Sequence, residues 1–146
     1  MNIHKWITAS LIKHFKANVS TPLYYHGENT NLTKGKKSYF ELRIDGPSIK
    51  QPSRTYFKVY VEVNVLISVY DNEGNIYKIE NLIGEISAAF NNTIPVYKLP
   101  EDTLVGCLTL NKDGIFPAKF GEVDPDLKLQ QATVEGHYEI QLETLE

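Results

Sequence analysis

Histidine, cysteine and carboxylate side chains carry most protein chemistry, and this chain holds few of them at useful spacing. Its four histidines are His4, His14, His26 and His137, and no pair has the spacing of a zinc motif. The single Cys107 lies in an alternating apolar segment, without the basic, exposed setting that activates a thiolate. We expect Cys107 to be a core or interface residue. We expect no catalytic residue, metal site or cofactor, so the chain is not predicted to be an enzyme.

Three glutamates near the C-terminus are the set that most resembles paired catalytic carboxylates. Glu135, Glu139 and Glu143 are four residues apart in a segment that alternates polar and apolar residues. Residues at even separations share one face of a strand, so we expect an acidic row that faces solvent or a neighbouring subunit. The sequence contains neither GxxxxGK[ST] nor GxGxxG, so no nucleotide site is predicted.

Charge is unevenly distributed along the chain. Residues 1–58 contain ten Lys/Arg and three Asp/Glu, and residues 59–146 contain five and fifteen, so their balances are +7 and −10 within a net charge of −3. Two interpretations stay open. The halves form separate surface regions, or a basic face of one copy meets an acidic face of the next. The basic part carries no nucleic-acid-binding motif, so no sequence-specific nucleic-acid partner is expected.

Length and composition are those of one globular domain, which we expect to span residues 1–146. The chain is 16.6 kDa with 42% hydrophobic residues, an ordinary value for a soluble protein. No apolar run approaches the ~18 residues that a membrane span needs. Lysines interrupt the first stretch, so we expect no signal peptide and no membrane partner. The lone cysteine gives no sign of an oxidising compartment, and we expect synthesis inside the cell.

A long alternating segment gives the clearest structural prediction. Every odd position from Phe57 to Val69 is apolar, which predicts one strand over Tyr56–Tyr70 with one buried face. Its other face carries Tyr56, Tyr60 and Tyr70. Tyrosine is enriched in protein interfaces, so these three are candidate subunit contacts.

The remaining elements follow from periodicity and turn residues. We predict an α+β fold, with a mostly antiparallel mixed sheet and two helices packed on one of its faces. The predicted elements are an opening helix through Trp6, Leu11 and Phe15, a short strand Leu23–Tyr25, a loop Gly27–Lys37, a strand Tyr39–Asp45, a loop Gly46–Arg54, a turn Asp71–Asn75, a helix Ile79–Phe90, strands Leu104–Leu110 and Ile115–Val123 separated by a turn Asn111–Gly114, and a closing strand Val134–Leu145.

This order of elements resembles the tail terminator (tail-to-head joining) proteins of long-tailed bacteriophages. In that family an amphipathic helix precedes a strand with a variable loop, here Tyr39–Asp45 and Gly46–Arg54. A long strand, here Phe57–Tyr70, then turns into a helix, here the one through Leu82 and Phe90. The resemblance covers nearly the whole chain as a pattern of elements and rests on no single motif.

The resemblance implies a non-catalytic virion subunit, made in the host cytoplasm, that forms a ring of six at the tail–neck junction. The ring would cap the tail tube and join it to the capsid neck. Implied partners are other copies of the chain, a tail tube protein and a neck or connector protein, while DNA passes through without specific binding. On this view Tyr56, Tyr60 and Tyr70 contact neighbouring subunits, the glutamate row faces the lumen, and Pro47, Lys50 and Arg54 belong to a docking loop.

Other functions fit the same pattern less well. One is another phage neck protein, such as a stopper or adaptor, and a second is a tail tube subunit. A helix directly after the long strand favours the terminator over the tube. A small α+β ligand-binding module or enzyme is the alternative from a different class. Such pockets need polar groups among the inward residues, and the inward positions here are almost wholly aliphatic or aromatic.

Overall fold

The computed structural model describes residues 2–26, 38–50, 54–70, 77–124 and 129–143. The predicted loop over 27–37 and turn over 71–75 lie outside the described residues. No helix in the described residues is long and apolar enough to cross a membrane. The elements are α1 (Ile3–Asn18), β1 (Leu23–Tyr25), β2 (Ser38–Lys50), β3 (Tyr56–Tyr70), α2 (Lys78–Ala89), β4 (Thr93–Lys98), β5 (Thr103–Asp124) and β6 (Leu129–Glu143).

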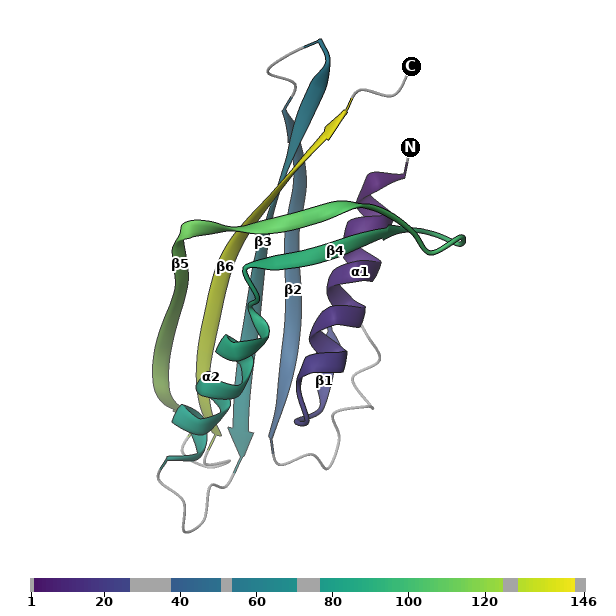
Figure 1. The fold of residues 1–146 in the computed structure, drawn as a ribbon. Coiled ribbons are helices and arrows are strands. Elements are labelled where there is room, and N and C mark those ends of the chain that lie inside the picture. Colours follow the sequence, from purple (N-terminus) through teal and green to yellow (C-terminus); the bar gives the residue numbers. More distant parts are fainter. Residues whose placement is uncertain (1, 27–37, 51–53, 71–76, 125–128, 144–146) are drawn as a thin grey trace.

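The strands form one six-stranded sheet in the order β1-β2-β3-β6-β5-β4. All neighbours are antiparallel except β1 and β2, which are parallel. The sheet is curled, and both helices lie on the same face of it (Figure 1). The predicted α+β fold with a mostly antiparallel mixed sheet is therefore confirmed.

Helix α1 lies inside the curl of the sheet. It packs against β1 and β2 near one edge of the sheet and against β4 at the other, whereas α2 packs on β3 and β6 (Figure 1). The buried apolar residues of α1 recur every three or four positions, which is the period that places them along one helix face. These residues are Ile3, Trp6, Ile7, Leu11 and Phe15.

Two polar contacts fix α1 against its neighbours. The Ser10 hydroxyl accepts a hydrogen bond of 3.0 Å from the backbone N–H of Tyr97 in β4. The Nε2 of His14 donates to the carbonyl of Ala89, 2.9 Å away at the end of α2. The amide nitrogen of Asn18 lies 3.4 Å from Nδ1 of the same ring.

Strand β3 has the bounds that the alternation predicts, and it is paired along its length. Strand β6 follows it from Tyr56↔Glu143 to Tyr70↔Leu129 without a register shift. The alternate residues that face the helices are almost fully buried, with exposed fractions between 0% and 3%, and they are Val59, Val61, Val63, Val65, Ile67 and Val69.

The predicted loop over Gly46–Arg54 is wrong in its first half. Strand β2 continues to Lys50, and Ser48 pairs with Tyr60 beyond a register shift that follows Asp45. Pro47 lacks an N–H but lies inside this bulge, where no ladder bond is required of it. Gly46 supplies the positive φ of 96° that the bulge needs. A proline can therefore interrupt the ladder without ending the strand.

The last third of the chain also differs from the prediction. The segment Asn111–Gly114 was expected to reverse the chain, but β5 runs through it as one strand that stays paired to β6. Gly114 has a φ of 81° and the Asn111 side chain accepts from the Asp113 N–H, so the turn residues form a bulge instead. Strand β4 was not predicted, and it contains Pro95. Pro95 is tolerated there because β4 is an edge strand.

Gly136 lies where β6 passes beneath a packed aromatic group. Phe90 stacks on Tyr138 at 6.4 Å between ring centroids and meets Phe15 edge-on at 5.0 Å. A Cβ on Gly136 would lie 2.7 Å from the Phe90 ring. The ring is 5% exposed and fixed by both neighbours, so it has little room to move. A glycine is therefore required at this position.

We predict that Gly136→Ala destabilises the protein by about 1–3 kcal/mol, the usual cost of overpacking a core. Urea unfolding followed by circular dichroism measures this. The matched control is Gly84→Ala in α2, where an added Cβ meets no atom within 4 Å. Because alanine favours helix over glycine, the control should be neutral or more stable by up to about 1 kcal/mol. Equal stability of Gly136→Ala and wild type would contradict the packing described here.

Candidate functional site

The face of the sheet opposite the helices, called here the open face, carries a hollow in its middle. Asp45 pairs with Glu62 across β2 and β3, and Glu62 pairs with His137 across β3 and β6. At the same level of the sheet, the register of β2 against β3 shifts after Asp45. The register of β5 against β6 shifts between the β5 residues that pair with Tyr138 and with Gly136. Bulges bend a strand locally, so irregular strands lie on both sides of the β3–β6 pair here.

The resulting hollow has a volume of about 280 Å³. We call it the acidic hollow, since carboxylates are prominent among its side chains and no lysine or arginine of the described chain lines it. Its polar side chains include Asp45, Tyr60, Glu62, Asn111, His137 and Glu139.

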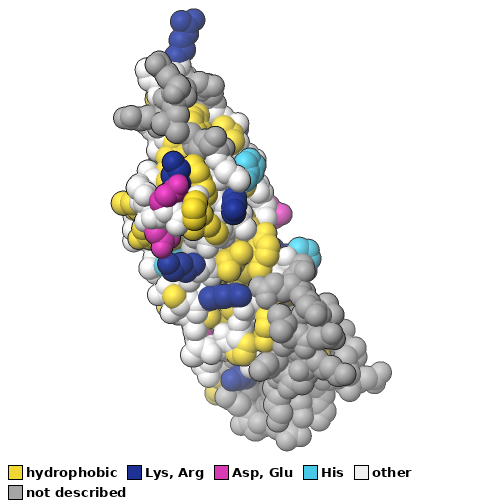
Figure 2. All heavy atoms as spheres, turned by 90° about the vertical axis from the view of Figure 1, so that its right-hand side faces the viewer, with side chains coloured by type: hydrophobic (Ala, Val, Ile, Leu, Met, Phe, Trp, Pro, Cys, Tyr) yellow, Lys and Arg dark blue, Asp and Glu magenta, His cyan; other side chains and the backbone are white. Residues whose placement is uncertain are grey.

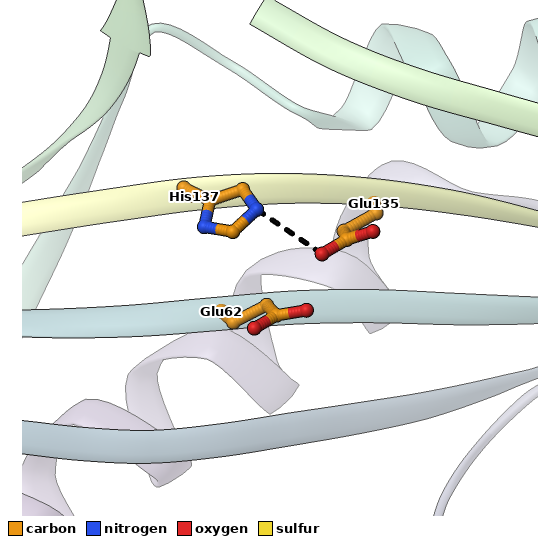
Figure 3. A group of neighbouring side chains, drawn as sticks. All are labelled: Glu62, Glu135 and His137. Atoms are coloured by element: carbon orange, nitrogen blue, oxygen red, sulfur yellow. Dashed lines mark hydrogen bonds and ion pairs between the residues drawn. The ribbon is translucent and has the colours of Figure 1, made fainter.

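Three side chains meet beside this hollow (Figure 3). Glu135 and His137 are two residues apart on β6 and so share a face, and Glu62 faces them from β3. One donor atom from each lies within 4.8 Å of the others. The Nε2 of His137 is 3.1 Å from Oε1 of Glu135 (Figure 3).

The two glutamates share a proton more readily than separate carboxylates would. A hydrogen bond with Glu135 raises the pKa of the Glu62 carboxyl above its ordinary value, and partial burial and the negative charge of Glu135 act in the same direction. The nearby His137 opposes this rise. Two adjacent carboxylates cannot both ionise freely, so this part of the open face attracts positive charge.

A carboxylate pair beside an imidazole has the donor types that suit a divalent cation. The same negative charge equally suits a lysine ammonium. In the described residues Glu135 is bonded to His137, so part of the donor set is already used within the group. The sequence did not indicate Glu62, because only the strand register brings it beside His137.

The predicted tyrosine contacts do not form one patch. Tyr56 and Tyr70 stand at opposite ends of β3, about 45 Å apart at the rise of ~3.3 Å per strand residue. Tyr60 lies under the Lys50 ammonium, 5.4 Å from its ring centroid.

Tyr70 belongs to an aromatic cluster at the end of the open face away from Tyr56. Its ring stacks on Tyr39 at 6.3 Å between centroids, and Tyr39 meets Tyr24 edge-on at 6.1 Å. Burial raises the pKa of the Tyr39 hydroxyl, and so does its hydrogen bond with Tyr70. Part of the surface of these three rings is therefore already in contact with another ring of the same subunit.

The other predicted residues are dispersed. Glu139 lines the hollow and Glu135 lies beside it, while the side chain of Glu143 is outside the described part. Pro47 is buried in the β2 bulge, whereas Lys50 and Arg54 are exposed on either side of residues 51–53, which are not described.

Cys107 was expected in the core or at an interface, and its exposure on β5 leaves the interface alternative. Glu85 was not predicted, and it has a structural role. Its carboxylate accepts hydrogen bonds from the backbone N–H and hydroxyl of both Ser20 and Thr21. Burial raises the pKa of Glu85, but these bonds outweigh burial and lower it overall. The carboxylate thus attaches the turn after α1 to α2.

Comparison with known proteins identifies a shared fold and no family. No protein-family model matches the chain, and no curated protein matches it. One solved structure covers 100% of this chain and 99% of its own, with a TM-score of 0.54 and 13% sequence identity. The name it carries describes no function. At this identity the likeness shows that the whole chain adopts a fold found elsewhere as a unit of about the same extent.

We predict that Glu62→Gln reduces the dependence of stability on pH. Because the pKa of Glu62 is higher in the folded chain than in the unfolded one, the folded state binds the proton more tightly. Wild-type stability should fall as pH rises from the ordinary glutamate pKa through this raised value. Glutamine can donate to Glu135 without a proton from solution, so the variant should lose less stability between about pH 4 and pH 7. Urea unfolding across this range measures the difference.

Glu101→Gln is the control for this experiment, since Glu101 is exposed in the turn between β4 and β5 and away from the hollow. It should follow the wild-type curve. A Glu62→Gln curve as steep as that of wild type would show that the two carboxylates do not share a proton.

Proposed function

We propose that this chain is a structural subunit of a bacteriophage virion, a tail terminator that assembles into a ring. The ring caps the tail tube and joins it to the neck beneath the capsid. Its partners are other copies of the chain, a tail tube protein and a neck or connector protein. DNA passes through the ring without specific binding.

The observation that carries this proposal is the open face. Both helices cover one face of the sheet, and the opposite face of four long strands carries no layer from the described chain (Figure 1). That face combines carboxylates with aromatic side chains such as Tyr24, Tyr39 and Tyr70. Aromatic residues with polar ends are typical of surfaces that meet another protein.

The shape of the subunit also suits assembly. The β2–β3 hairpin extends past the helices at one end, and the β4–β5 hairpin extends to the side (Figure 1). On β5, Leu104, Phe116 and Phe120 are each about half exposed, at 57%, 49% and 56%. Leu104 belongs to the β4–β5 hairpin, whereas Phe116 and Phe120 lie where β5 runs along β6. Exposed apolar side chains of this kind are available for contacts between subunits.

The ligand-binding alternative has less support. The acidic hollow measures about 280 Å³, below the range of about 300–1,000 Å³ typical of small-molecule pockets. Such pockets are mostly apolar with a few polar groups, whereas this hollow is lined by several charged side chains on an open sheet face. We therefore place adhesion ahead of ligand binding.

We predict that the purified protein forms a closed ring. Repeated head-to-tail contacts close into a ring when the rotation between neighbouring copies divides a full turn evenly. Six copies of the 16.6 kDa chain give a particle of about 100 kDa. Light scattering after gel filtration measures the mass, and negative-stain imaging shows whether the particle is a ring. A monomer at every concentration tested, with or without tail tubes, would contradict the proposal.

A further inference from the structure

The acidic hollow contains carboxylates that no lysine or arginine of the described residues neutralises. Among the described residues, no lysine or arginine forms an ion pair with Asp45, Glu62 or Glu139, although all three line the hollow. The neighbouring Arg43 is 3.4 Å from Glu41 instead. Negative charge therefore gathers at the centre of this face. A proton on Glu62 and the neighbouring His137 relieve part of the Coulomb repulsion, and a cation from a second subunit would relieve more of it.

The opposite side of the molecule presents the complementary charge. Helix α1 contains three lysines and no Asp or Glu. Lys5 and Lys13 are exposed on it, and Lys98 of β4 lies beside it, with its ammonium 5.7 Å from the Trp6 ring centroid. Figure 2 shows the molecule from the side on which α1 lies in Figure 1, with Lys and Arg side chains spaced along it and a smaller number of Asp and Glu side chains among them.

We propose that the acidic hollow of one copy receives the basic side of α1, carrying Lys5 and Lys13, from a second copy of this chain. The inference rests on the proposed ring assembly and specifies the contact that builds it. The hollow and α1 lie on opposite sides of the sheet, so the contact joins two different surfaces. A pair of copies therefore still has one free hollow and one free α1 surface. Repetition of such a heterologous contact produces a ring when the rotation closes.

This contact changes the role expected for two of the row's three glutamates. The sequence pattern left Glu135, Glu139 and Glu143 facing solvent or a neighbouring subunit, and the family resemblance implied that they face the lumen. The structure brings Glu135 and Glu139 together with Asp45 and Glu62 in and around one concave site. A concave acidic site with no lysine or arginine partner among the described residues suits a protruding basic side chain better than a channel wall that repels DNA, so we assign it to the interface.

The test uses charge reversal on each side separately and then on both. One variant carries Glu62→Lys and Glu139→Lys, a second carries Lys5→Glu and Lys13→Glu, and a third carries all four substitutions. Sedimentation velocity gives the mass of each at equal concentration. The first two should remain at 16.6 kDa, because every interface then joins like charges. The third should regain the wild-type mass, and an equal mixture of the first two should co-assemble.

Salt and metal additions complete the test. Wild-type association should weaken at least about tenfold between ~0.05 M and ~0.5 M NaCl, because salt screens such pairs. Circular dichroism establishes that each variant is folded. If both charge-reversal variants form the same ring as the wild type, this contact is overturned and the proposed ring assembly stands. If the wild type is monomeric, both the contact and the ring assembly are overturned. Association that EDTA abolishes and Zn²⁺ restores, with the helix reversal silent, would assign the hollow to a metal ion and overturn the proposal.

Discussion

The packing of α1 inside the curled sheet is the constraint on which the rest of the molecule depends. The helix touches β1 and β2 near one edge and β4 at the other, so its apolar face sets how far the sheet curls. Each fully buried side chain such as Ile7, Leu11 or Phe15 contributes about 1.5–3 kcal/mol. The Ser10 and His14 hydrogen bonds then fix the helix's position along β4 and α2. Because the helices fill the concave side, the open face has no covering layer from the described chain.

The two bulges convert this regular sheet into a surface with a specific site. Without them β2 and β5 would run straight past β3 and β6, and the open face would be flat at this level. The bulge at Gly46–Pro47 and the one at Asn111–Gly114 lie on opposite sides of the Glu62–His137 pair. Bulges often re-aim side chains near functional sites, and here they lie on both sides of the place where the carboxylates of the hollow gather.

Much of the fold could be predicted from local patterns. The helical spacing from Ile3 to Phe15 and the alternation over Tyr56–Tyr70 reflect burial against one face, and burial repeats with the period of the element. The errors fall where a residue has two structural uses. Pro47 and Pro95 can end a strand or occupy a bulge or an edge, and the Asn111–Gly114 segment can form a turn or a bulge. Only the neighbouring strands decide between these.

The candidate site could be predicted only in part. The row of Glu135 and Glu139 follows from alternation within one strand, but the presence of Glu62 and Asp45 depends on register between strands. Register is set by long-range pairing along β2, β3 and β6, and one sequence contains no direct signal for it. The separation of Tyr56 and Tyr70, in contrast, depends on no register, because both residues belong to β3 and stand at its two ends.

The central claim is that the open face becomes covered by another copy of the chain. Carbodiimide-activated amidation of exposed carboxylates, read out by mass spectrometry, measures this residue by residue. Labelling of Asp45 and Glu139 should fall several-fold when the protein is concentrated from the monomeric to the assembled state, while labelling of exposed Glu101 stays constant. Equal labelling of Asp45 and Glu139 in both states would show that the open face stays uncovered, and would contradict the account.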